Sequence, residues 1–415
     1  MAQQNNFDKP IKRLTANSAI VLSFIVALEI VIMISPFAFF FYAVFNPFLL
    51  TLNQWIITRW LTAFFLPHMI VPPNEILILI RILGSVFFVG GMFVFLVCAG
   101  QVYWCKLLKK GTVTKGLYVF VRHPQYVSLA FAALGLAIMW PRFLTLLLLA
   151  VMLFMYYILA KDEERRMVNR FGESYINYMN QTGMFLPRPI ERLFTKNANL
   201  HQGLSILRVG AVFVMLFIVI VGSGFILRAY TVHHLPLKQI SNVDVIAITP
   251  EDLTVADELI PLVLQDSVII SKLKSFLRNP DHRLLAYFIP IDYVMQGMMA
   301  NTGDEWKLFE QHKTIGMITE YIFHPFAHLT GGHAQHMGNM KHGPEMYALP
   351  TMKRRVIFID VSSDDQLNSP LDDFDINVKR TPLFFVDVHL HTAEILQVND
   401  TPAGSGWGTV PTPMF

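Results

Sequence analysis

Residues 122–164 read RHPQYVSLAFAALGLAIMWPRFLTLLLLAVMLFMYYILAKDEE. This stretch contains two apolar runs, residues 126–140 and 143–160, with only Pro141 and Arg142 between them. So short a break between two apolar runs predicts a helical hairpin in a membrane. Basic residues follow the second run and indicate that the hairpin returns to the cytoplasmic side; they are Lys161, Arg165, Arg166 and Arg170.

Three longer apolar runs accompany the hairpin, at residues 18–44, 75–101 and 204–227. Each can cross a hydrocarbon core of ~30 Å. The first follows basic residues and lacks a small-residue cleavage motif, so we expect a retained signal anchor with a cytoplasmic N-terminus. Residues 47–71 are interrupted by polar side chains and include two tryptophans, which predicts an interfacial helix. A crossing there would place the basic segment 106–122 outside, against the charge rule.

The charge of the chain reverses near residue 228. Residues 1–228 carry 20 basic and 8 acidic residues, whereas residues 229–415 carry 13 and 22. With 53% apolar and only 15% charged residues, the composition excludes a disordered chain, a coiled-coil rod and an ordinary soluble enzyme. A basic membrane half joined to an acidic soluble half is indicated, and no nucleic-acid partner is expected.

The sequence therefore predicts an α-helical membrane bundle, of about five transmembrane helices plus an interfacial helix, with a C-terminal extracytoplasmic α+β domain. Helix-like residues 266–277 and strand-like residues 355–361 and 383–390 support the mixed character of that domain. We expect an integral protein of the bacterial inner membrane. Its expected divisions are the anchor and interfacial region (1–75), the membrane core (76–200), the last transmembrane helix (201–228) and the acidic domain (229–415).

Charged side chains gather at the two outer ends of the hairpin. Arg122 and His123 precede it, and Glu163 and Glu164 follow it. A hairpin brings its ends together, so these groups should share one pocket at the cytoplasmic edge of the membrane. Charges at this depth are costly unless they are paired or used, which makes a functional site the default hypothesis. In the alternative reading, the basic pair only flanks the membrane and the acidic pair begins a surface helix.

Two motifs flank the hairpin in order, Arg-His-Pro-x-Tyr and Glu-Glu-x6-Phe-Gly-x2-Tyr-x2-Tyr. Over residues 76–190, the chain resembles the integral membrane methyltransferases that include isoprenylcysteine carboxyl methyltransferase and the phospholipid N-methyltransferases. The resemblance implies S-adenosylmethionine as cofactor and a lipophilic acceptor, a membrane lipid or lipidated substrate, that enters from the bilayer. The family usually has glycine where this chain has Ser128. The implied cofactor-binding residues are Arg122, His123, Tyr126, Glu163, Glu164 and Tyr175, with His123 and Tyr126 also implied as catalytic.

These residue types fit methyl transfer without a nucleophilic side chain, because an in-line displacement depends mainly on positioning and exclusion of water. Arg122 could pair with the carboxylate of the cofactor. Glu163 or Glu164 could accept hydrogen bonds from its ammonium or ribose hydroxyls. His123 could assist deprotonation of an amine acceptor, whereas a carboxylate acceptor needs no base. The sequence leaves the acceptor open.

The acidic half contains a segment rich in histidine and methionine. Five histidines and three methionines fall within residues 324–346. Imidazole and thioether ligands without thiolate suit copper, and His389 and His391, at strand spacing, could add a ligand. In the competing interpretation this glycine-rich segment is an interaction surface. The candidate copper ligands are His324, His328, His333, His336 and His342.

Three functions stay in competition on the sequence alone. The first is a membrane methyltransferase with an appended soluble domain. In the second, the methyltransferase-like bundle is a noncatalytic scaffold, and the C-terminal domain docks a partner of a larger membrane complex. In the third, the protein handles a metal through its histidine and methionine segment. Binding of S-adenosylhomocysteine separates the first from the others, and copurification with membrane partners favours the second.

Overall fold

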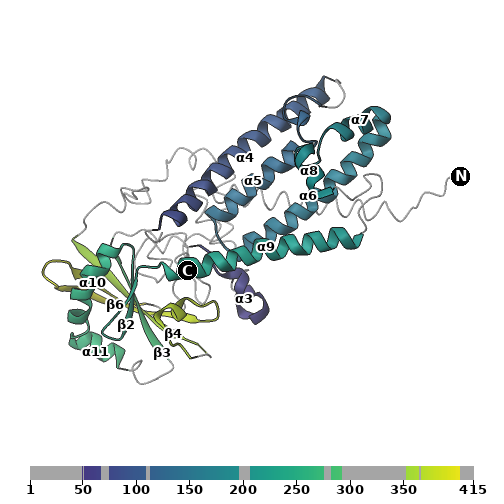
Figure 1. Cartoon of the computed structure of the whole chain (residues 1–415). Coiled ribbons are helices and arrows are strands. Elements are labelled where there is room, and N and C mark those ends of the chain that lie inside the picture. The colour runs from purple at the N-terminus through teal and green to yellow at the C-terminus, as the bar shows by residue number, and fades with distance from the viewer. Residues whose placement is uncertain are drawn as a thin grey trace, which may run out of the picture. The chain divides into compact units, whose positions relative to one another are not determined.

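The computed structural model describes residues 49, 51–66, 74–108, 113–195, 206–274, 282–291, 352–363 and 366–401 (Figure 1). The chain forms two compact units. The described part of Leu79–Phe225 is called the membrane unit here, and the described parts of Val31–Ile78 and Ile226–Phe415 are called the sheet unit. Each unit is considered by itself.

Long apolar helices build the membrane unit. Three helices in the described part of the chain are long and apolar enough to cross a membrane, over Glu75–Cys105, Phe143–Phe171 and Val209–His233, and Pro124–Met139 is a shorter apolar helix. Four of the five predicted spans are therefore helical, while residues 18–44 lie outside the described residues. The helices are α4 (Glu75–Leu107), α5 (Pro124–Met139), α6 (Phe143–Phe171) and α9 (Ile206–His233).

Short helices follow the long ones. The 3₁₀ helix η1 (Gly116–Val119) precedes α5, and α7 (Glu173–Gln181) and α8 (Arg188–Thr195) follow α6. In the sheet unit, α3 (Ile56–Thr62) lies within the predicted interfacial segment. Its position at a membrane interface stays a prediction.

Helix α6 is longer than its apolar run predicts. The run ends at residue 160, but the helix continues to Phe171 and ends at Gly172, whose φ is 57°. Charged residues extend it because Asp162 pairs with Arg165 and Arg166 at helical spacing. The two glutamates of the second motif therefore lie on the same rigid helix as the apolar wall.

Small residues let α4 and α5 approach closely. A Cβ atom added at Gly135 would lie 2.3 Å from the backbone nitrogen of Phe88, and one added at Gly91 would lie 2.6 Å from the carbonyl oxygen of Ser128. Ser128 is buried, and its hydroxyl donates to the carbonyl of Gln125. Serine at this position is thus accommodated in a close helix contact of the small-residue type.

A six-stranded sheet, in the order β1-β2-β3-β4-β5-β6, forms the centre of the sheet unit. Strands β2 and β3 are parallel, and all other neighbours are antiparallel. The parallel pair needs a crossover, which α10 (Pro250–Val263) and α11 (Ser267–Leu273) supply. The strands are β1 (Leu237–Ile240), β2 (Val243–Ala247), β3 (His282–Pro290), β4 (Lys353–Ser362), β5 (Lys379–His389) and β6 (Ile395–Asp400).

Both faces of this sheet are buried. Along β3, Ala286 and Phe288 belong to the core that includes residues of α10 and α11, whereas Tyr287 and Ile289 belong to the opposite core. This alternation is the two-residue period of a strand. Figure 1 shows α10 and α11 along one side of the sheet, and η4 (Pro370–Phe374) contributes Phe374 to the core on the other face. The expected mixture of helices and strands is confirmed, although α11 is shorter than the predicted helix.

Candidate functional site

The two ends of the hairpin meet as the sequence predicts. Arg122, which precedes α5, donates from Nε to Oε1 of Glu164 on α6 over 2.5 Å. The ring of His123 lies between both glutamates, with Nδ1 3.5 Å from Oε2 of Glu163 and Nε2 3.7 Å from Oε1 of Glu164. We call Arg122, His123, Glu163 and Glu164 the hairpin cluster.

Arg122 also fastens the end of α7. Its Nη1 donates to the carbonyl oxygen of Met179 over 3.0 Å and to the carbonyl oxygen of Thr182. Carbonyl groups at a helix C-terminus attract cations, so this contact is favourable as well as geometrically specific. The guanidinium is therefore committed to the protein itself on three sides, and a contact between Arg122 and a cofactor stays a prediction.

Backbone pairing fixes the first motif in place. The amide of Arg122 donates to the carbonyl of Gly183 over 2.8 Å, and the amide of His123 donates to the carbonyl of Met184 over 3.2 Å. Gly183 has no room for a side chain, since an added Cβ would lie 1.7 Å from the carbonyl oxygen of Leu186. The segment after α7 thus holds the motif like a short strand.

Aromatic rings continue the site from the hairpin cluster into the membrane unit. The ring of His123 stacks on Tyr126 at 5.5 Å, and Tyr126 stacks on Tyr156 of α6 at 5.1 Å. The Tyr126 hydroxyl lies 3.5 Å from Oε2 of Glu163. This column of three rings leads from charged groups to apolar ones.

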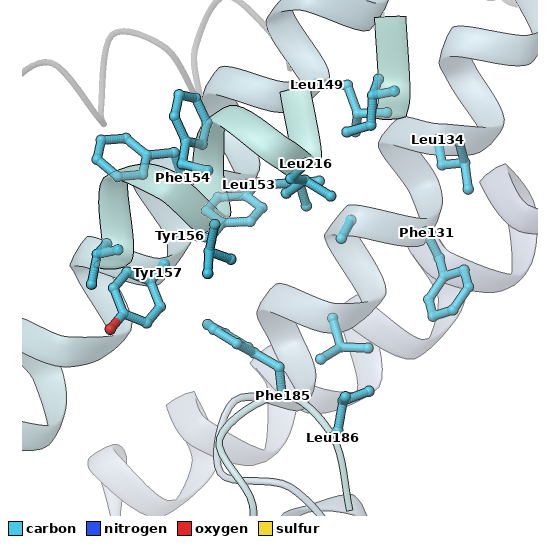
Figure 2. Close-up of a pocket in the computed structure, with 16 residues that line it drawn as sticks. Phe131, Leu134, Leu149, Leu153, Phe154, Tyr156, Tyr157, Phe185, Leu186 and Leu216 are labelled. Atoms are coloured by element: carbon cyan, nitrogen blue, oxygen red, sulfur yellow. The ribbon is translucent and has the colours of Figure 1, made fainter. Parts of the chain in front are cut away.

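Beyond the column lies an apolar cavity of about 570 Å³. Its walls come from α5, α6, α9 and the loop that carries Phe185 and Leu186. Figure 2 shows Phe185 reaching toward the cavity from that loop, with Leu153, Tyr156 and Leu216 around it. The hydroxyls of Tyr156 and Tyr157 are the only side-chain polar groups among the lining residues. The described site therefore joins a charged end to an apolar chamber.

The surroundings of His123 favour its protonated form. The side chain is only about 1% exposed, and burial lowers its pKa, but the carboxylates of Glu163 and Glu164 raise it more, so the pKa lies above its usual value. Within the described residues, neither ring nitrogen makes a hydrogen bond of normal geometry. His123 is thus a buried ring with hydrogen-bonding capacity left over.

The predicted site residues fall into two groups. Arg122, His123, Tyr126, Glu163 and Glu164 meet at the hairpin ends. Tyr175 is buried on α7, and its ring contacts that of Tyr178 at 5.6 Å. Burial is the main reason that the pKa of the Tyr175 hydroxyl lies above its usual value, and the Glu164 carboxylate adds to the effect. Tyr175 therefore remains a neutral phenol.

Sequence reasoning missed several contributors to the site. Met179 and Thr182 act through their backbone carbonyls, which no side-chain pattern reveals. Tyr156 could have been found, because it lies two helical turns before Glu163 and so on the same face of α6. That inference requires the helix to extend through the charged residues, and the apolar run alone predicted an earlier end.

The candidate copper ligands lie outside the described residues; they are His324, His328, His333, His336 and His342. The strand spacing expected of His389 and His391 is wrong, because β5 ends at His389 and the chain turns there. Their rings are 6.3 Å apart. In the part of the chain that the structure describes, no group of histidine, cysteine and acidic residues could hold a metal ion. The copper hypothesis stays a prediction without support from the fold.

The sheet unit also buries charged groups. Arg355 and Asp387 face each other across β4 and β5, with Nε–Oδ1 at 2.6 Å and Nη2–Oδ2 at 2.7 Å. A second group joins Asp244, Arg283 and the fully buried Asp373. Burial and the neighbouring Asp244 carboxylate raise the pKa of Asp373 to about 8. These groups lie inside the sheet unit, and none of them is a lining residue of the apolar cavity.

Comparison with known proteins locates the family resemblance. Residues 79–174 match the family described as phospholipid methyltransferase. The chain is 34% identical over 76 residues to the protein-S-isoprenylcysteine O-methyltransferase of Schizosaccharomyces pombe. This matched segment covers 18% of this chain and 32% of that protein. The chain thus spans about a third of the length of this relative. No solved structure matches. The resemblance predicted from the two motifs is confirmed for this segment.

Proposed function

We propose that this chain is an S-adenosylmethionine-dependent membrane methyltransferase that acts on a lipophilic carboxylate. The premise is that residues 79–174 match the phospholipid methyltransferase family. One observation carries the proposal. His123, held between two carboxylates, lies at one end of an aromatic column whose other end lines an apolar cavity. A charged methyl donor and a lipophilic acceptor require neighbouring compartments of these two kinds.

The hairpin cluster fits the polar parts of S-adenosylmethionine. Glu163 keeps 38% of its side chain exposed, and its nearest polar contacts in the described residues are 3.5 Å long. This carboxylate can therefore accept hydrogen bonds from an ammonium or from ribose hydroxyls. The unsatisfied nitrogens of His123 can donate to a carboxylate. When bound, the cofactor would supply a methyl group on a positively charged sulfur.

The state of His123 favours a carboxylate acceptor over an amine. An amine must lose a proton during methylation, and a nearby group must accept that proton. The neighbouring carboxylates raise the pKa of His123, which favours its protonated form over the neutral form that could accept this proton. A carboxylate has no proton to lose, and its methylation gives a neutral ester.

The apolar cavity suits the hydrocarbon part of such an acceptor. Ligand cavities of about 300 to 1,000 Å³, lined mainly by apolar side chains, are the usual kind of small-molecule site. With α5, α6 and α9 as walls, an acceptor could reach the site from the bilayer. The similar protein of Schizosaccharomyces pombe is a protein-S-isoprenylcysteine O-methyltransferase, which agrees in class with a lipophilic carboxylate acceptor.

We also propose that the hairpin cluster lies on the cytoplasmic side and the sheet unit on the other side, in a bacterial inner membrane. The basic segments at residues 106–122 and 161–170 support this orientation. Protease added to right-side-out vesicles should remove residues beyond about 230 and spare the membrane unit. Protection of the sheet unit from the protease would reverse the topology.

The experiment that tests the function compares two acceptors. The purified full chain, in lipid nanodiscs with labelled S-adenosylmethionine, should methylate N-acetyl-S-farnesylcysteine and not phosphatidylethanolamine. The product should release its label in mild base, as methyl esters do. Glu163→Gln should lower the rate, whereas Asp162→Asn should not, because Asp162 pairs with Arg165 and Arg166 outside the cluster. Label on the amine instead would overturn the carboxylate assignment.

A noncatalytic scaffold remains the competing function. The whole sheet unit lies outside the matched segment, as expected of a domain that docks a partner. A protein that transfers no methyl group to either acceptor, binds no S-adenosylhomocysteine and copurifies with stoichiometric membrane partners would establish that alternative.

A further inference from the structure

We propose that the point where α6 and α9 close on each other limits the length of the hydrocarbon chain that the cavity accepts, with Ile220 as the specificity-determining residue. This inference rests on the proposed function for the identity of the chain that enters. It concerns α9, which lies outside the segment that matches the methyltransferase family.

The cavity runs lengthwise between the helices. Its lining on α9 extends from Val209 to Ile220, and its lining on α6 extends from Tyr157 back to Leu149. At 1.5 Å per residue the α9 wall is roughly 16 Å long. Helices α6 and α9 are antiparallel, because Phe154 meets Phe213 while the earlier Phe143 meets the later Phe225. Since Tyr156 stacks on Tyr126, Tyr157 and Val209 belong to the end near the hairpin cluster.

The far end of the cavity closes one helical turn beyond Ile220 and Leu149. Gly224 lies one turn after Ile220, and Leu146 lies one turn before Leu149. A Cβ atom added at Gly224 would lie 2.6 Å from Cδ1 of Leu146 and 3.0 Å from Cε1 of Phe143. The ring of Phe143 also packs on Phe225 at 4.4 Å. No space for a chain remains at this level.

The two helices are farther apart nearer the hairpin cluster. There the ring centroids of Phe154 and Phe213 are 4.4 Å apart, so two large side chains lie between the helices. At position 224, α9 instead has a glycine. The α9 backbone at Gly224 therefore lies directly against side chains of α6, whereas two aromatic side chains lie between the helices nearer the charged end. Ile220 and Leu149 are the last lining residues before the closure.

The size of the cavity is that of an ordinary ligand site. Its volume of about 570 Å³ lies within the range of about 300 to 1,000 Å³ that is usual for small-molecule sites, so a hydrocarbon chain can occupy it. The charged groups at the open end and the apolar closure at the far end fix the direction in which the chain lies. Chain length, measured from the hairpin cluster to Ile220, is then the property that the protein selects.

Binding measurements on the full chain test this proposal without depending on methyl transfer. The probes are dansyl-labelled S-geranyl, S-farnesyl and S-geranylgeranyl cysteine, titrated into the protein in nanodiscs. Ile220→Phe should weaken the two longer probes by about tenfold or more relative to the geranyl probe, the discrimination expected when a pocket loses room for a few carbons. Leu149→Ala should shift the preference in the opposite direction, toward the longest probe.

Val219→Phe is the matched control, because Val219 neighbours Ile220 on α9 but points outward with 60% of its surface exposed. It should leave the order of the three affinities unchanged. The length limit would be overturned if the ratio of the affinities for the long and short probes stayed unchanged in both Ile220→Phe and Leu149→Ala. An equal loss of affinity for all three probes would overturn it as well. A changed ratio in a protein that transfers no methyl group would support the length limit while refuting the proposed function.

Discussion

The membrane unit and the sheet unit each bury an arginine against a carboxylate. The two pairs differ in how many hydrogen bonds the carboxylate accepts. In the sheet unit, Arg355 donates two hydrogen bonds to Asp387, and Gln397 donates a third to the same carboxylate. In the membrane unit, Arg122 donates one hydrogen bond to Glu164. Beside that pair, His123 and Glu163 lie at distances of 3.5 Å or more from their nearest polar partners.

This difference separates a structural ion pair from a site with spare capacity. The cross-strand pair in the sheet unit is complete and needs no ligand. In the hairpin cluster, the hydrogen-bonded pair of Arg122 and Glu164 supports an incomplete half, His123 with Glu163. Buried polar groups normally find partners, so the incomplete half is where a charged ligand is expected to bind.

The largest expected effect comes from breaking either buried pair. Arg122→Ala should destabilise the membrane unit by about 3–5 kcal/mol, and Arg355→Ala should do the same to the sheet unit, because each removes the arginine that is hydrogen-bonded to a buried carboxylate. Thermal denaturation in nanodiscs, followed by unit-specific proteolysis, measures both. A loss of cofactor binding in Arg122→Ala without loss of stability would contradict the structural role assigned to this arginine.

A smaller effect should come from the incomplete half. Glu163→Gln should raise the KM for S-adenosylmethionine by the equivalent of about 1.5–3 kcal/mol, the range for a hydrogen bond to a charged group, with an unchanged melting temperature. Asp162→Asn is the matched control on the same helix. If Glu163→Gln melted at a clearly lower temperature, Glu163 would be a structural residue like Asp387.

Asp373 should give the sheet unit an unusual pH dependence. Its pKa in the folded chain is about 8, well above the usual value near 3.9, so the folded state favours the protonated form. Stability should fall as the pH rises from about 4 through 8. Asp373→Asn should flatten this profile and stabilise the unit by about 1–3 kcal/mol at high pH, since it removes a poorly satisfied buried charge. A profile identical to that of the unmutated chain would refute the assignment.

The smallest effect concerns the protonation of His123. Its pKa is raised in the folded chain, so its stabilising contribution is complete below about pH 6.5 and is lost as the pH rises through the folded value. His123→Asn should remove this dependence from the melting temperature of the membrane unit. Stability that rises with pH in the unmutated chain, traced to this residue, would show that His123 is neutral.

Local pattern predicted much of this arrangement. The hairpin, and with it the meeting of Arg122 with Glu164, follows from two apolar runs separated by Pro141 and Arg142. The extent of α6 did not follow, because hydropathy ends at residue 160 while helix propensity and charge pairing continue to Phe171. The cavity could not be predicted either, since α9 joins it from a distant part of the sequence.

Calorimetric titration of the full-length protein in nanodiscs with S-adenosylhomocysteine tests the central claim most directly. We predict saturable binding of one molecule per chain, because the hairpin cluster forms a single site. We also predict that the chain keeps its melting temperature when Glu163→Gln abolishes most of that binding. A well-folded unmutated chain that binds no S-adenosylhomocysteine would contradict the assignment of the hairpin cluster as a methyl-donor site.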